Sequence, residues 1–276
     1  MINLNLCIVS ATPELFEDAA EHALSNAEGL VHLYGAGNGC NLVTEVYRLY
    51  SRHMRSDEQC FNGTGSTKNG AVPAAFHRLW QTVREQSSSV PDDVLVYIHD
   101  DVRILEKDWD TRVRAVFEKD PKCGLAGFGG ATALGGDEIY KVPYQVHQLG
   151  RRNFYSNMRG AELHGERETN ERPIVFTDGF SMIVRRSLLD TINGWSWWPD
   201  DLVHHAYDYG IACMARRHGY TAWLVPCAVD HRGGLTATTK IYQDLANSLG
   251  GDAKVHERSH KFVYETFRDV LPLRLP

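Results

Sequence analysis

Apolar runs and amphipathic stretches alternate through the first half of the chain. Short runs rich in β-branched and aromatic residues are followed by segments in which apolar residues recur every three to four positions, as on one face of a helix. This pattern predicts strands at 4–10, 30–34, 94–98 and 123–128, and helices at 13–25, 43–53, 70–85 and 107–119. Because strands and helices alternate, we expect an α/β fold with a parallel sheet covered by helices on both faces.

The second half of the chain has a weaker pattern. Residues 129–172 are rich in Gly, Arg and Glu and show no period, which is typical of a lid or binding loop. A polar loop is also expected at 56–68. Further on, the pattern predicts strands at 174–177, 180–184, 220–225 and 228–231, helices at 187–193 and 203–218, and an amphipathic C-terminal region.

Composition narrows the class of protein. The 276 residues are 43% hydrophobic and 23% charged, which is ordinary for a soluble globular protein. A net charge of -6 argues against non-specific binding to nucleic acid phosphates, which needs clustered Lys and Arg. The six cysteines show no CxxC spacing, and no apolar run approaches the roughly 18 residues of a membrane span. We therefore expect a soluble, cytoplasmic protein with reduced thiols.

The expected strand at 94–98 ends abruptly at His99, Asp100 and Asp101. In an open α/β sheet, ligands bind at the carboxyl ends of the strands. Two carboxylates and an imidazole at this position can therefore hold a divalent cation against a phosphorylated ligand. The same acids can instead cap the helix that follows. The junction alone leaves both interpretations open.

Five further motifs follow in the second half of the chain. They are Asp178-Gly179 before an apolar run and two arginines, Gly194-Trp195, Asp208 within Tyr-Asp-Tyr-Gly, Gly219-Tyr220 after an Arg-rich helix, and His231 at the end of the last expected strand. Together with the acids after residue 98, this order resembles the nucleotide-sugar glycosyltransferases of the GT-A fold, and family 2 in particular. The resemblance extends over about residues 4–232.

The resemblance implies a single GT-A domain with a Rossmann-like, mostly parallel central sheet flanked by helices. Residues 1–235 would form this domain, with the nucleotide sugar bound by 1–128 and the acceptor and catalytic groups in 129–235. Residues 236–276 would add a C-terminal helical extension.

The resemblance also implies a metal site and a catalytic base. Asp101 matches the last acid of the family's DxD cluster, His231 matches its late histidine, and His99 stands where the family more often has the first acid. These residues would hold Mn²⁺ or Mg²⁺, which stabilises the charge of the departing diphosphate. Asp208 would take the proton of the acceptor hydroxyl. From the residues alone, Asp208 can also be a helix N-terminal acid, and His231 a packed histidine.

The remaining candidate residues are expected to contact the two substrates. Those expected at the nucleotide sugar are Ser10, Ala11, Thr12, Lys68, Asn69, Asp100, Asp178 and Gly179. Those expected at the acceptor are Trp195, Trp197, Trp198 and Asp201. Sugar rings stack on aromatic faces, although each tryptophan can equally belong to the core. Asp200 and Asp201 are rival candidates for the base.

The expected activity is transfer of a hexose from a UDP-sugar to an acceptor hydroxyl. Inversion is expected because a single base without an enzyme nucleophile implies a single displacement. A glycan is the favoured acceptor, and a protein or a hydroxymethylated DNA base can also supply the hydroxyl. Two other classes stay open: a nucleotidyltransferase that acts on sugar phosphates, and a non-catalytic carbohydrate-binding protein.

Overall fold

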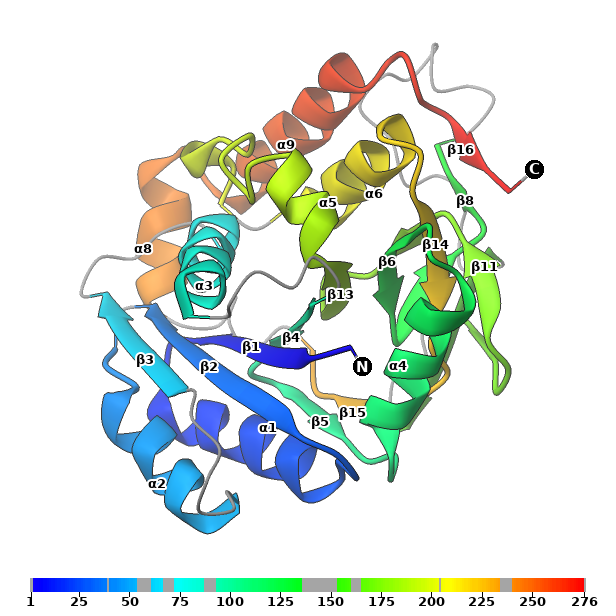
Figure 1. Ribbon diagram of the computed structural model, residues 1–276. Helices are drawn as coiled ribbons and strands as arrows, with labels where there is room; N and C mark the ends of the chain where they lie inside the picture. Colours follow the sequence, from blue (N-terminus) through cyan, green and yellow to red (C-terminus); the bar gives the residue numbers. More distant parts are fainter. Residues whose placement is uncertain are drawn as a thin grey trace.

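An eight-stranded sheet lies at the centre of the protein (Figure 1). The computed structural model describes residues 2–38, 40–53, 61–66, 72–86, 93–135, 153–159, 165–203, 205–233 and 240–275. The strand order is β11-β14-β6-β13-β4-β1-β2-β3. These strands are β1 (Leu4–Ser10), β2 (Val31–Asn38), β3 (Phe61–Ser66), β4 (Val94–His99), β6 (Cys123–Gly127), β11 (Arg172–Ile174), β13 (Ser181–Arg185) and β14 (Thr221–Leu224).

Helices cover both faces of this sheet. Alternate residues of a strand point to opposite faces, so Cys7 and Val9 of β1 belong to one core cluster and Leu6 and Ile8 to another. The first cluster includes residues of α3 (Val72–Gln86), α5 (Arg186–Thr191), α6 (Tyr207–Arg217) and α9 (Asp252–Thr266). The second includes residues of α1 (Pro13–Ser25), α2 (Val43–His53) and α4 (Trp109–Lys119). The prediction of a covered α/β sheet is confirmed.

Strand direction brings polar chain segments to one edge of the sheet. β1 runs parallel to β4, with Val9 opposite His99, so the carboxyl ends of both strands lie side by side. β13 runs antiparallel to β4, with Ser181 opposite Ile98. The segment that precedes β13, which includes Asp178, therefore lies at the edge of the sheet where β4 ends.

A second, smaller sheet stands next to this edge. Its order is β12-β7-β9-β15-β5, and β10 (Glu166–Arg167) pairs with β9. The other strands are β12 (Phe176–Thr177), β7 (Gly129–Ala131), β9 (Phe154–Arg159), β15 (Ala228–His231) and β5 (Val102–Ile104). β5 directly follows the β4 turn and pairs antiparallel with β15, which places His231 opposite Val102.

The C-terminal helices join the same packed body. α8 (Lys240–Ser248) and α9 follow the second sheet, and Val263 and Phe267 at the end of α9 belong to the core cluster that holds α6. The last strand, β16 (Leu273–Arg274), pairs with β8 (Ala133–Leu134). Figure 1 shows α9 running behind α5 and α6 before the chain reaches β16.

The structure corrects two sequence expectations. Residues 56–68 were expected to form a loop, but 61–66 form the edge strand β3, which pairs parallel with β2. Its Asn-Gly-Thr-Gly-Ser sequence has no apolar alternation, so only the backbone pairing makes it a strand. Residues 129–172 were expected to form one long loop, but the described parts include β7, β8, β9 and β10. Three of these strands have only two or three residues, which is too short to show a period, and β9 mixes polar and apolar residues without alternation.

β2 is also longer than expected, because it continues through Gly35, Ala36 and Gly37 to Asn38. A Cβ at Gly35 would lie 2.8 Å from the ring of Phe16 in α1. The glycine therefore allows α1 to pack closely on β2. Among the described cysteines, Cys7, Cys40, Cys123, Cys213 and Cys227 are all free thiols. No described helix is both long and apolar enough to cross a membrane.

Asp110 in α4 provides a test of how this fold is held together. Its side chain is fully buried and accepts hydrogen bonds from the backbone N–H groups of Glu28 and Gly29, at 2.8 and 2.9 Å, and from Arg114. Asp110→Ala removes the acceptor of the Glu28 and Gly29 N–H groups and of one Arg114 amine, while Arg114 keeps its hydrogen bonds to the Ile2 and Leu30 carbonyls. We expect it to lower the free energy of unfolding by about 3–5 kcal/mol in urea denaturation.

Asp269→Ala is the matched control, because it removes an exposed pair with Arg217. Solvated pairs contribute little, so this variant should unfold at nearly the wild-type urea concentration. Equal midpoints for the two variants would show that the Asp110 contacts do not stabilise the fold.

Candidate active site

Three potential metal ligands converge where the two sheets meet. His99 is the last residue of β4, Asp101 follows in the turn to β5, and His231 is the last residue of β15. Each offers one ligand atom, and these atoms lie within 4.8 Å of one another. Asp101 Oδ1 is 3.4 Å from His231 Nε2 and 4.0 Å from His99 Nδ1.

Backbone pairing and one ring contact set this arrangement. The antiparallel β5–β15 pair continues into a hydrogen bond from the Arg232 N–H to the Asp101 carbonyl, at 3.1 Å. The ring of Phe180 stacks on the His231 imidazole at 4.9 Å. Both contacts limit the positions that the His231 side chain can take relative to Asp101.

The charge at this cluster suits a divalent cation. Burial raises the pKa of the Asp101 carboxyl, but the His231 and His99 imidazoles outweigh that effect and hold the pKa below its usual value. Asp101 Oδ1 is buried and accepts no hydrogen bond within the described part of the chain. A buried carboxylate oxygen without a donor, facing two imidazoles, fits a cation that takes oxygen and nitrogen ligands.

Asp208 lies in the first turn of α6 and lines the same cavity as His99. Its Oδ2 accepts a hydrogen bond from the Gly179 N–H at 3.2 Å, and its Oδ1 accepts one from the Tyr209 N–H at 3.0 Å. Burial, followed by the negative charge of Asp178, raises the pKa of Asp208 to about 7. This carboxylate can therefore exchange a proton near neutral pH.

Asp208 and His99 line one cavity of about 260 Å³, and the other two candidate ligands, Asp101 and His231, do not line it. The residues that line it are His99, Asp178, Gly179, His205, Ala206, Tyr207, Asp208, Tyr209, His256 and His260. The expected residues His99, Asp178, Gly179 and Asp208 are thus brought together in one cavity.

The first strand ends in a separate polar cluster. The Ser10 hydroxyl lies 2.5 Å from Asp100 Oδ2 and accepts a hydrogen bond from the Thr12 N–H at 3.1 Å. Thr12 Oγ1 accepts a hydrogen bond from the Leu15 N–H at 3.4 Å and so caps α1. Burial raises the pKa of Asp100 to about 6. Ser10, Ala11, Thr12 and Asp100 therefore share the edge where β1 and β4 end, as expected, whereas Lys68 and Asn69 lie outside the described residues.

Two of the three expected acceptor tryptophans are buried. Trp195 and Trp198 are only 1% and 4% exposed. Their rings pack against Phe76 and Phe262, with centroid distances of 5.6 and 5.3 Å. This packing favours the alternative that these two rings belong to the core, and their contact with an acceptor stays a prediction. Only the half-buried Trp197 retains an accessible part.

Asp201 and its neighbour Asp200 also lie apart from the cavity. Both belong to a 3-10 turn, Asp200–Leu202, and neither lines the cavity that contains Asp208. Asp201 is exposed, and its carbonyl accepts a hydrogen bond from Arg258 of α9 at 3.4 Å. The geometry thus favours Asp208 over these two acids as the base.

Sequence reasoning missed six residues that line the cavity: His205, Ala206, Tyr207, Tyr209, His256 and His260. His256 and His260 are four positions apart in α9, which puts them on one helical face. That spacing could have indicated that the two histidines contribute to one site. It was missed because the C-terminal region was treated as an extension of the catalytic domain.

The fold and the site together define a glycosyltransferase-like protein. The model of a family described as "Glycosyltransferase like family" matches residues 79–231, which is more than half of the chain. The chain belongs to this family. No sequence in the collection of curated proteins matches it.

Solved structures agree on the fold. The crystal structure of residues 1–349 of TarS from S. aureus has a TM-score of 0.53 and 10% identity, covering 98% of this chain and 72% of that one. The complex of the same TarS fragment with UDP has a TM-score of 0.51 and 10% identity, with 98% and 71% covered. At this identity the similarity concerns the fold alone, and it confirms the expected single-domain GT-A architecture.

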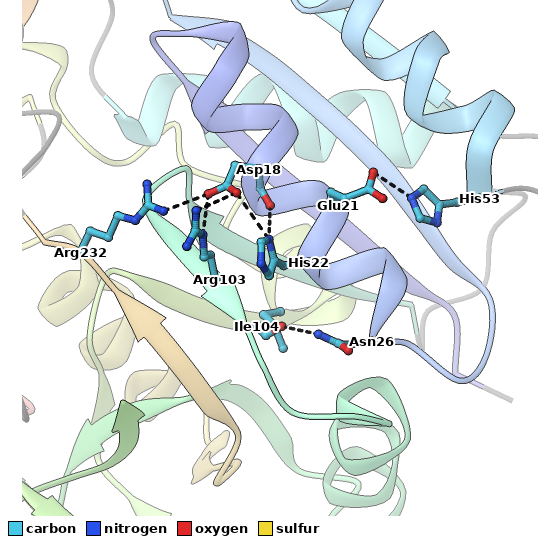
Figure 2. A network of polar contacts seen from close by, with 8 residues as sticks. All are labelled: Asp18, Glu21, His22, Asn26, His53, Arg103, Ile104 and Arg232. Atoms are coloured by element: carbon cyan, nitrogen blue, oxygen red, sulfur yellow. Dashed lines mark hydrogen bonds and ion pairs between the residues drawn. The ribbon is translucent and has the colours of Figure 1, made fainter. Parts of the chain in front are cut away.

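An ionic bridge joins two chain segments next to the candidate ligands Asp101 and His231 (Figure 2). Asp18 of α1 accepts two hydrogen bonds from Arg103, at 2.6 and 2.9 Å. Its Oδ2 also lies 3.5 Å from Arg232 Nη2. Arg103 is two residues after Asp101, and Arg232 is next to His231. One carboxylate on α1 therefore holds both strands close to the points where they present their ligands.

Asp18→Ala removes this bridge. We expect the affinity for Mn²⁺ to fall roughly tenfold, which is the scale of losing a partner that orients a metal ligand. Titration of Mn²⁺ followed by electron paramagnetic resonance (EPR) measures this. Asp244→Ala, which removes an exposed pair with Lys240, should bind Mn²⁺ like the wild type. An unchanged affinity in Asp18→Ala would mean that the bridge does not position the ligands.

Proposed function

We propose that the protein is a metal-dependent, inverting glycosyltransferase that moves a hexose from a UDP-sugar to an acceptor hydroxyl. The observation that carries this proposal is the cavity in which Asp208 and His99, one of three converging metal ligands, both take part. Membership in the glycosyltransferase-like family supports the reaction class. The UDP complex of the TarS fragment supports a uridine nucleotide as the donor.

Asp101, His231 and His99 would hold Mn²⁺ or Mg²⁺. A cation bound there stabilises the negative charge that develops on the diphosphate as the bond to the sugar breaks. Asp100 and Ser10, beside this cluster, would meet the nucleotide part of the donor together with Ala11 and Thr12. The proposed donor half therefore corresponds to residues 1–128, and Lys68 and Asn69 remain candidates within it.

Asp208 would act as the general base. The acceptor hydroxyl must lose its proton as it attacks the anomeric carbon, and the Asp208 carboxylate can accept that proton. Its backbone donors, Gly179 and Tyr209, fix the orientation of the carboxylate. Because no second carboxylate is needed as a nucleophile, we propose a single displacement with inversion.

The acceptor would approach through the cavity that contains Asp208. A glycan is the acceptor class we favour, and a protein or a hydroxymethylated DNA base presents the same hydroxyl chemistry. The nucleotidyltransferase alternative has less support. Such enzymes hold phosphates with a glycine-rich loop, whereas β1 leads directly through Ser10 and Ala11 to Thr12, the cap of α1.

Calorimetric titration of UDP with and without Mn²⁺ tests the donor and the metal. We expect Mn²⁺ to strengthen UDP binding, and Asp101→Ala to remove most of that gain. Asp208→Asn should retain Mn²⁺-dependent UDP binding while its turnover of UDP-hexoses falls about 10²–10⁴-fold, because only the base is lost. The proposal would be contradicted if Mn²⁺ did not change the affinity for UDP, or if Asp208→Asn turned over UDP-hexoses at the wild-type rate.

The pH dependence of turnover tests the base separately. A base must be unprotonated, so turnover should fall about tenfold for each pH unit below a midpoint near the Asp208 pKa, and stay level above it. That midpoint is expected at about 7. Asp178→Asn removes a charge that raises the pKa of Asp208, so it should move the midpoint to lower pH. A wild-type midpoint near about 4, the usual value for Asp, would exclude Asp208 as the base.

A further inference from the structure

A chain of hydrogen bonds leads from His99 into the protein. His99 Nε2 lies 2.8 Å from the hydroxyl of Tyr207, which is 2% exposed. The Tyr207 hydroxyl in turn donates to the carbonyl of Gly179 at 3.3 Å. A hydroxyl that gives its only proton to a carbonyl can accept one from an imidazole. With the Tyr207 proton directed at the Gly179 carbonyl, His99 would carry its proton on Nε2 and donate it to the Tyr207 oxygen.

This tautomer leaves the lone pair of the His99 imidazole on Nδ1. Nδ1 is the atom that faces Asp101 Oδ1, at 4.0 Å. A histidine that binds a metal usually donates its other ring N–H to a fixed partner, which sets the tautomer and the ring orientation. Tyr207 meets that description for His99.

Gly179 makes room for this partner. A Cβ at position 179 would lie 2.8 Å from the Tyr207 hydroxyl oxygen, so any side chain there would displace the hydroxyl. The glycine of the Asp178-Gly179 motif thus serves two purposes. Its carbonyl and its missing side chain fix Tyr207, and its N–H binds Asp208.

We infer that His99 is a metal ligand through Nδ1, positioned by Tyr207, and that the resulting site selects transition-metal dications such as Mn²⁺, Co²⁺ or Zn²⁺ over Mg²⁺ and Ca²⁺. Two imidazole nitrogens and one carboxylate oxygen favour borderline cations, whereas Mg²⁺ and Ca²⁺ take oxygen ligands. The inference rests on the cation site of the proposed function. It narrows that proposal by excluding Mg²⁺ as the preferred ion.

The number of imidazole ligands can be counted directly. Pulsed EPR of the full chain with Mn²⁺ and saturating UDP should detect two coordinated imidazole nitrogens in the wild type and one in His99→Asp. A single imidazole in the wild type overturns the inference, whatever the variant does. It would leave the proposed glycosyltransferase function intact, because Asp101 and His231 can still hold a cation.

Competition between Mn²⁺ and Mg²⁺ tests the selectivity. Wild-type protein should retain Mn²⁺ in a large excess of Mg²⁺. His99→Asp should lose about tenfold or more of that preference, because an oxygen ligand replaces nitrogen. Tyr207→Phe keeps the ligand set, so its Mn²⁺ affinity should fall about tenfold or more while its preference for Mn²⁺ over Mg²⁺ is retained.

Tyr220→Phe is the matched control, because it removes a hydroxyl that donates a bond of 3.3 Å to Ser187. It should bind Mn²⁺ like the wild type. The inference would be overturned if His99→Asp kept the wild-type preference for Mn²⁺ over Mg²⁺, or if Tyr207→Phe and Tyr220→Phe bound Mn²⁺ with equal affinity. Failure of the wild type to bind any of these cations would overturn the proposed metal dependence as well. Cation binding without UDP binding would contradict only the proposed donor.

Discussion

The buried carboxylate of Asp101 is the constraint on which the site depends. A carboxylate with little access to water is stable only beside positive charge, hydrogen-bond donors or a metal ion. Here the nearest groups are two imidazoles, from β4 and β15, and one carboxylate oxygen accepts no hydrogen bond within the described residues. The site therefore depends on whatever holds those two strands together.

Strand direction provides that support. β5 follows the turn after β4 and pairs antiparallel with β15, which brings His231 close to Asp101. Asp18 then joins the arginines that follow both ligands. On the other side, antiparallel β13 places the Asp178-Gly179 segment between β4 and α6, where it contacts both Tyr207 and Asp208. The residues proposed for metal binding and for proton transfer thus contact one shared backbone segment.

Much of this could be predicted from particular residues. The buried run of β4, followed by two acids, indicated a ligand site at the carboxyl end of a strand, and the order of Asp178, Asp208 and His231 indicated the GT-A fold. For the tryptophans the sequence could not choose between sugar binding and the core, since both uses need the same aromatic side chain; burial of Trp195 and Trp198 favours the core. Strand β3 was missed because its polar sequence pairs through the backbone alone.

The sequence by itself determined the order of strands and helices and the identity of the reactive groups, because periodicity and residue type are local properties. It could not determine which side chains meet. His99 and Tyr207 are 108 positions apart, and α9 joins the cavity from near the C-terminus. Tertiary packing decided these contacts, because burial and strand direction set them, and neither can be read from neighbours in the chain. It also decided which nitrogen of His99 faces Asp101.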